Sequence, residues 1–275
     1  MSPNDVASLL LRLSERDLAV LESLRAHRLL GTAQIRRLHF AEGHATVAAA
    51  SGATMRVLVR LESHGLVGRL TRRIGGVRSG SSGIVWQLAA TGERLLRTVH
   101  GEKKRRRYVE PSLAFTAHTL AVAELAVQLH EYAGQGAIEL LSVETEPSCW
   151  RSFVNPHGTL EWLKPDLYAV TASGDYEDHW FLEADRATEH PTVVVRKAKT
   201  YQRYAATGAH QARLGLFPAV TWVVPDMARR GALEAALSAE TGVQPELFRV
   251  VTVDEFGQLI TGAQPDAPTD ATGPP

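Results

Sequence analysis

The sequence predicts a multi-domain α/β protein, and two features carry this prediction. The charge is divided along the chain: residues 1–110 hold 19 Lys and Arg against 9 Asp and Glu, and residues 111–275 hold 11 against 21. Net charges of about +10 and −10 therefore cancel to zero, which indicates two domains with different electrostatic roles. The periodicity also changes, because helical spacing with one hairpin is followed by helices that alternate with apolar strands.

Three helices are predicted at the start of the basic half. The first follows Ser14, a favourable N-cap, and the second starts at Gly31. A third helix, capped by Ser51 or Thr54, runs to about His64. The apolar residues at helical spacing that form the predicted core faces are Leu18, Leu21, Leu24, Ile35, Leu38, Met55, Leu58 and Leu61.

A β-hairpin and a further helix follow. Residues 67–74 alternate apolar and basic side chains, residues 75–83 form a Gly- and Ser-rich turn, and residues 84–88 return as a second strand. A helix over 93–99 completes the order of a winged helix-turn-helix, which we predict over residues 14–100.

The outward side chains of this predicted domain suit duplex DNA. A third helix of this kind enters the major groove, and the hairpin reaches the backbone or the minor groove. Arginines of the hairpin have no acidic residue between them, so they gain affinity from counterion release at phosphates. The expected DNA-binding residues are Thr54, Arg56, Arg60, Arg69, Arg72, Arg73 and Arg78. The alternatives are a merely solvated hairpin face and a winged helix that binds protein.

Residues 101–111 form a basic linker. We expect its run of cations to grip phosphates, with a solvated hinge as the alternative. These cations are Lys103, Lys104, Arg105, Arg106 and Arg107.

The acidic half, residues 112–256, predicts the core order of a restriction-endonuclease-like α/β fold: helix, three strands, helix, strand. The helices are expected at 113–132, 193–206 and 227–241, and the strands at 138–143, 164–170, 179–183, 219–225 and 248–252. The strand at 219–225 is almost continuously apolar, as a buried central strand should be. Residues 261–275 are rich in Pro, Ala, Asp and Thr and are expected to be a disordered tail.

Two carboxylates fall at the ends of neighbouring strands of this core. Pro165-Asp166 opens one strand, and Glu183 closes the next. Carboxylate oxygens are the ligands that Mg²⁺ prefers, and a bound Mg²⁺ polarises a phosphate and lowers the pKa of the attacking water. The pair is typical of PD-(D/E)xK nucleases, but the lysine usual two residues after the glutamate is replaced by Asp185.

The missing lysine leaves two interpretations. In an active nuclease, Asp166 and Glu183 bind Mg²⁺ and Lys197 or Lys199 reaches the site from the following helix. Alternatively, Asp185 is a further metal ligand. Glu124, on the first helix of this half, is a candidate third carboxylate. In the other interpretation the carboxylates form a satisfied polar cluster, and the domain is a non-catalytic scaffold, which the substitution by Asp favours.

The chain as a whole resembles the replication-relaxation family, over roughly residues 14 to 255. The resemblance is carried by Pro165-Asp166, by the segment Phe181 to Glu189, and by Lys197 and Tyr201 in a Lys-x-x-x-Tyr helix. The family is associated with plasmids and integrative elements of actinobacteria and related bacteria. The resemblance implies a role in the replication, relaxation or mobilisation of such an element, without supplying a reaction.

These observations predict a cytoplasmic DNA-binding accessory protein of a mobile element. The alternatives are an active Mg²⁺-dependent endonuclease or nickase and a winged-helix transcription regulator. Duplex DNA is the expected partner, and replication or relaxase proteins and a second copy of the chain remain open. The single cysteine, Cys149, excludes an intrachain disulfide and is expected to be inert, and no apolar run reaches the length of a membrane span.

Overall fold

A computed structural model describes residues 8–70, 83–103 and 111–262 of the chain. The chain divides into two compact units, residues 1–127 and residues 128–275. The division falls inside a long helix, α6 (Leu113–Gly134), whose residues therefore contribute to both units. The mixed α/β prediction is confirmed. In the described residues, no helix has the length and apolar character that crossing a membrane requires.

The N-terminal unit holds a small antiparallel sheet and several helices besides the start of α6. Its elements are α2 (Glu15–His27), β1 (Leu30–Gly31), α3 (Thr32–His39), α4 (Val47–Ser63), β2 (Val67–Arg69), β3 (Val85–Leu88) and α5 (Ala90–Val99). The strands lie in the order β1-β3-β2. Trp86 of β3 is fully buried in the core that these elements share. Strand β1 was not predicted, because two residues show no periodicity.

Helix α4 begins earlier than the sequence predicts. The Oγ1 of Thr46, rather than Ser51 or Thr54, caps the helix by accepting a hydrogen bond from the N–H of Ala49 at 3.1 Å. Thr54 therefore lies inside the helix, where its hydroxyl donates to the Ala50 carbonyl at 2.8 Å. The helix ends as expected at Gly65, whose φ of +67° is the left-handed conformation that favours glycine.

The C-terminal unit is built on one five-stranded mixed sheet. Its strands are β4 (Glu139–Thr145), β7 (Leu167–Ser173), β8 (Tyr176–Ala184), β9 (Ala219–Val224) and β10 (Phe248–Thr252). They lie in the order β10-β9-β8-β7-β4. The first three in sequence are antiparallel neighbours, as the predicted meander requires, and β8, β9 and β10 are parallel to one another.

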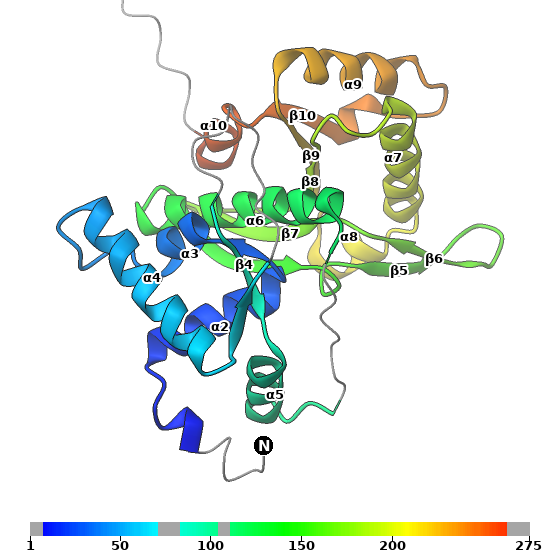
Figure 1. Ribbon diagram of the computed structural model, residues 1–275. Helices are drawn as coiled ribbons and strands as arrows, with labels where there is room; N and C mark the ends of the chain where they lie inside the picture. Colours follow the sequence, from blue (N-terminus) through cyan, green and yellow to red (C-terminus); the bar gives the residue numbers. More distant parts are fainter. Residues whose placement is uncertain (1–7, 71–82, 104–110, 263–275) are drawn as a thin grey trace, which may run out of the picture. The chain divides into compact units, whose positions relative to one another are not determined.

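Helices cover this sheet and complete its core. They are α7 (Pro191–Ala206), α8 (Ala209–Leu214), α9 (Met227–Ala239) and α10 (Phe256–Thr261). Helices α7 and α9 contact each other, and Figure 1 shows α9 crossing above α7. Buried side chains of α7, among them Val194 and Ala198, pack with Phe181 of β8 and Trp222 of β9. This packing sets the rotation of α7 about its axis relative to the sheet.

A separate hairpin of β5 (Arg151–Val154) and β6 (Leu160–Leu163) stands apart from the five-stranded sheet (Figure 1). This hairpin was not predicted from the sequence, and neither were α8 and α10. Each strand of the hairpin has only four residues, too few for alternation to stand out. The predicted disordered tail lies outside the described residues beyond Gly262.

Candidate active site

The predicted carboxylate pair lies at one end of the central antiparallel strands. Leu167 of β7 pairs with Leu182 of β8, so Asp166 and Glu183 are the next residues beyond this pair. The Oδ2 of Asp166 accepts a hydrogen bond from the N–H of Ala184 at 2.9 Å, which ties the start of β7 to the end of β8. Asp166 is 7% exposed and Glu183 is 2% exposed. The fold therefore brings two nearly buried carboxylates together.

A lysine reaches this pair from helix α7. The Nζ of Lys197 donates a hydrogen bond to Oε2 of Glu183 and lies 3.6 Å from Oδ1 of Asp166. The Lys197 side chain is 32% exposed, so solvent reaches this side of the cluster. Lys199 points elsewhere and pairs with Glu240 at 2.6 Å. Of the two helix lysines predicted for the site, the structure brings Lys197 to the carboxylates.

A tyrosine completes the surroundings of Glu183. The hydroxyl of Tyr201 donates to Oε1 of Glu183 at 2.5 Å, and the Tyr201 side chain is fully buried. Tyr201 belongs to the Lys-x-x-x-Tyr motif of the sequence, but no role was predicted for it. The available signal was spacing: Tyr201 follows Lys197 by four residues and therefore shares its helix face, whereas Lys199 does not.

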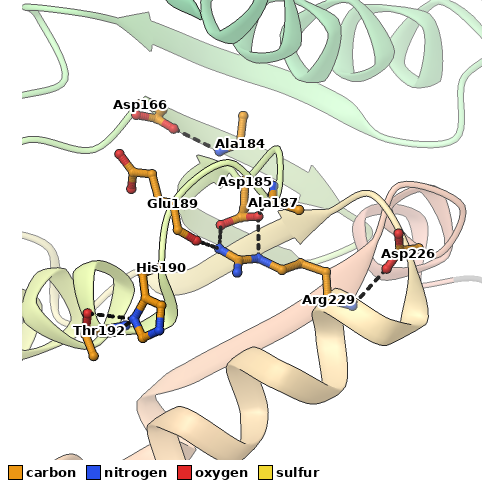
Figure 2. A network of polar contacts seen from close by, with 9 residues as sticks. All are labelled: Asp166, Ala184, Asp185, Ala187, Glu189, His190, Thr192, Asp226 and Arg229. Atoms are coloured by element: carbon orange, nitrogen blue, oxygen red, sulfur yellow. Dashed lines mark hydrogen bonds and ion pairs between the residues drawn. The ribbon is translucent and has the colours of Figure 1, made fainter.

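Asp185 takes no part in this cluster, contrary to its prediction as a catalytic residue or metal ligand. Its carboxylate accepts two hydrogen bonds from the guanidinium of Arg229, at 2.8 and 2.7 Å, and one from the N–H of Ala187 at 2.7 Å (Figure 2). Asp185 lies just beyond the end of β8, where the strand alternation stops, and Ala187 turns the chain with a φ of +55°. Asp185 is thus a structural residue that joins the end of β8 to the start of α9.

The Arg229 guanidinium also donates to the carbonyl of Glu189 at 2.8 Å, so it holds both ends of the segment that leads to α7. His190 then caps α7 by accepting from the N–H of Thr192 (Figure 2). The short-range hydrogen bonds of this segment fix where α7 begins, and therefore where Lys197 stands.

Glu124, the predicted third carboxylate, already has partners within the N-terminal unit. It lies in the N-terminal unit, where it forms an ion pair with Arg37 and accepts a hydrogen bond from Gln34 at 3.0 Å. Within the described part of the chain, no group of three or more His, Cys, Asp or Glu side chains is arranged to hold a metal ion. Asp166 and Glu183 are therefore the carboxylates available to a cation at this site.

The electrostatics of the cluster follow from its burial. Burial raises the pKa of Glu183, and the Lys197 ammonium opposes this rise. Burial lowers the pKa of Lys197, but the charges of Glu183 and Asp166 outweigh this effect, so the pKa of the lysine is raised. Lys197 is therefore a charged ammonium at neutral pH, and its single positive charge offsets part of the negative charge of the two carboxylates.

Cys149 lies next to the site but has no reactive character. Its thiol is buried and donates to the carbonyl of Pro165 at 3.1 Å. Burial raises the pKa of Cys149 to about 12, so the thiol stays protonated at neutral pH, as expected of an inert cysteine.

Three of the predicted DNA-binding residues in the N-terminal unit are buried or already have a partner within the unit. Thr54 is fully buried and is not available to DNA, because it lies on the same face of α4 as the buried Ala50 and Leu58. Arg60 pairs with the buried Asp17 at 2.6 Å, and Arg69 pairs with Glu62 at 2.7 Å while lying over the Trp86 ring.

Arg56 and Lys103 are exposed. The other predicted DNA-binding residues lie outside the described residues. They are Arg72, Arg73, Arg78, Lys104, Arg105, Arg106 and Arg107.

Fold and site together define a two-unit α/β protein with a carboxylate–lysine cluster at the strand ends of a mixed sheet. The chain belongs to the replication-relaxation family, whose model matches residues 21–220. Asp166, Glu183 and Lys197 fall within the matched residues, and Arg229 falls outside them.

One solved structure and the curated proteins complete the comparison. The chain is similar to the restriction endonuclease FokI bound to DNA, at 12% identity and a TM-score of 0.28. The similarity covers 90% of this chain and 44% of the FokI chain, so this chain spans less than half of that protein's length. A TM-score of this size does not establish a shared fold. No curated protein matches the chain.

Proposed function

We propose that this replication-relaxation protein binds duplex DNA through its N-terminal unit and cleaves a DNA strand at Asp166, Glu183 and Lys197 during replication, relaxation or mobilisation of a mobile element. The observation that carries the proposal is the position of Lys197. Its ammonium lies between the two carboxylates, as the lysine missing from the strand would. Two carboxylates that can bind a cation thus have a lysine next to them. Asp166, Glu183 and Lys197 are the three groups that this proposal uses for phosphodiester hydrolysis.

DNA binding rests on the organisation of the N-terminal unit. Two helices, α3 and α4, precede the antiparallel pair β2–β3, and β1 adds a third strand beside β3. This order supports a winged helix-turn-helix, in which α4 enters the major groove. Arg56 is exposed on α4 and is therefore the described residue of that helix best suited to a phosphate or a base edge.

The carboxylate pair fits Mg²⁺ in donor type. Mg²⁺ is commonly bound by one or two carboxylates together with waters and substrate phosphates. Oε2 of Glu183 and Oδ1 of Asp166 both face the Lys197 ammonium, so two hard oxygens already surround one positive charge. A bound Mg²⁺ would polarise the phosphate and make a water nucleophilic near neutral pH.

The residues of the chain then have separate roles. Asp166 and Glu183 would hold the cation, and Lys197 would compensate for the negative charge that builds up on the phosphate oxygens. Water attacks the phosphorus, one P–O ester bond breaks, and the leaving oxygen takes up a proton. For this step Lys197 has to leave its ion pair with Glu183, which its partly exposed side chain permits.

A non-catalytic scaffold is the second candidate, favoured by one observation. Both oxygens of Glu183 already have partners, because Lys197 donates to Oε2 and Tyr201 donates to Oε1. In this alternative the ion pair is permanent and the C-terminal unit holds DNA, a relaxase or another copy of the chain. A transcription regulator would use the N-terminal unit alone.

Cleavage of supercoiled plasmid separates these candidates. We expect Mg²⁺ or Mn²⁺ to support nicking by the full chain, and EDTA, Asp166→Ala and Glu183→Ala to abolish it. Glu240→Ala is the matched control, because Glu240 is an ion-paired carboxylate of the same unit that binds Lys199 outside the site. Absence of nicking with intact, salt-dependent DNA binding would establish the scaffold instead, and nicking that survives both site substitutions would assign it to a contaminant.

A further inference from the structure

Lys197 and Tyr201 both donate hydrogen bonds to the Glu183 carboxylate from helix α7. They stand four residues apart on α7, and each donates to a different oxygen of Glu183 on β8. Tyr201 takes Oε1 at 2.5 Å, which leaves Oε2 facing the ammonium. One helix face therefore controls both oxygens of the carboxylate that the proposed function assigns to the cation.

The Tyr201 ring is locked in place by the core. It is fully buried, and its centroid lies 5.5 Å from that of Phe181 and 6.0 Å from that of Trp222. A ring held on two sides cannot move its hydroxyl toward another acceptor, so the donor has a fixed position. Tyr201 thus presents a rigid hydrogen-bond donor to Glu183.

The orientation of the Glu183 carboxylate depends on such a donor. The last torsion of a glutamate side chain is broad, so packing alone does not select one orientation of the two oxygens. Because Tyr201 holds Oε1, Oε2 of Glu183 faces the Lys197 ammonium. The same ammonium lies 3.6 Å from Oδ1 of Asp166.

We propose that Tyr201 is a positioning residue, whose hydroxyl orients Glu183 so that one of its oxygens acts together with Asp166 on the cation at this site. The inference rests on the proposed function for the identity of that cation as Mg²⁺. In this role Tyr201 contacts neither the cation nor the DNA, but it affects how tightly Asp166 and Glu183 bind the cation.

The test compares Tyr201→Phe with Tyr204→Phe in the full chain. Both residues are buried on α7, and both substitutions remove one hydroxyl, but Tyr204 contacts His210 at 3.1 Å rather than the site. Calorimetric titration of Mn²⁺ into the DNA-free chain should give an affinity about 10- to 100-fold weaker for Tyr201→Phe and unchanged for Tyr204→Phe. Replacing Tyr201 by 4-aminophenylalanine, which restores a donor, should recover the affinity.

A second measurement needs no metal. The ¹⁵Nζ resonance of Lys197, identified by its loss in Lys197→Arg, should shift or broaden in Tyr201→Phe, because the carboxylate that holds the ammonium is no longer fixed. Tyr204→Phe should leave this resonance unchanged. Retention of the thermal unfolding temperature within the range of the Tyr204→Phe control ensures that both variants are folded.

The outcomes separate the two proposals. A Lys197 resonance unaffected by Tyr201→Phe overturns the positioning role, whatever the chain does to DNA. A changed resonance in a chain that binds no Mn²⁺ and nicks no plasmid supports the positioning of Glu183 and overturns the catalytic function. A changed resonance with weakened Mn²⁺ binding supports both.

Discussion

The ammonium of Lys197 on helix α7 contacts the carboxylate of Glu183 on strand β8, and so supplies from a helix the lysine that the strand lacks. Asp185, which stands in the expected position of that lysine, pairs with Arg229 instead. The two ion pairs begin two residues apart at the end of β8 and lead to different helices. The departure from the sequence motif therefore removes a lysine from the end of the strand without removing one from the site.

Lys197→Met should abolish nicking, with a loss of at least about 100-fold, because the charge on the scissile phosphate is no longer compensated. Lys199→Met should nick like the unchanged protein, since Lys199 pairs with Glu240 outside the site. Rates of plasmid relaxation with Mg²⁺ provide the comparison. Equal losses in both variants would argue that α7 contributes only general positive charge.

Asp185→Ala should destabilise the C-terminal unit by about 3 kcal/mol, because it leaves the Arg229 guanidinium buried without its partner. The two side chains are 6% and 9% exposed, so solvent offers little compensation. Denaturant unfolding measures the loss, and the double variant Asp185→Ala, Arg229→Met should lose less. Asp226→Ala, which removes only the N-cap of α9, should cost about 1 kcal/mol.

DNA binding should become weaker with salt, and Arg56→Ala should reduce the slope of log affinity against log salt by about 1 if Arg56 contacts a phosphate. Glu62 already neutralises Arg69, so Arg69→Ala should change the slope less. Fluorescence anisotropy of a labelled duplex at several salt concentrations tests both variants. A flat salt dependence in the unchanged protein contradicts DNA binding through arginine.

Acidification should destabilise the C-terminal unit through His210. Burial lowers the pKa of His210 to about 4, whereas the unfolded chain takes up the proton near the ordinary value of 6.5. The stabilising contribution of the neutral imidazole is therefore complete above about pH 6.5 and is lost as the pH falls toward 4. Aromatic rings, among them Phe181 and Phe217, surround the imidazole and cannot compensate its charge.

Denaturant unfolding of His210→Phe at pH 7.5 and pH 5 checks this expectation. The variant should lose less stability between the two pH values than the unchanged protein. The exposed His157, substituted by Asn, is the control and should leave the pH dependence as it is. An unchanged acid sensitivity in His210→Phe would mean that other groups cause it.

The features that were predicted correctly depend on interactions between residues close in sequence. Capping by Ser14, the helical stripe of α2 and the continuous apolar run of β9 depend on neighbours within a few positions, and each element formed where expected. Predictions were wrong where two local signals competed, as at the start of α4, where Thr46 rather than Ser51 or Thr54 accepts the capping hydrogen bond.

The amino-acid sequence was enough to predict the mixed α/β character, the strand that follows Asp166, the strand that closes with Glu183, and the family motif. Three contacts became evident only from the folded chain: Lys197 rather than Lys199 meets the carboxylates, Tyr201 donates to Glu183, and Asp185 pairs with Arg229. The physical reason is that these contacts depend on the rotation of α7 and the approach of α9, which are set by packing between segments far apart in the chain. Sequence periodicity indicates which face of a helix is buried. The partner of each polar side chain on that helix depends on which other elements pack against it.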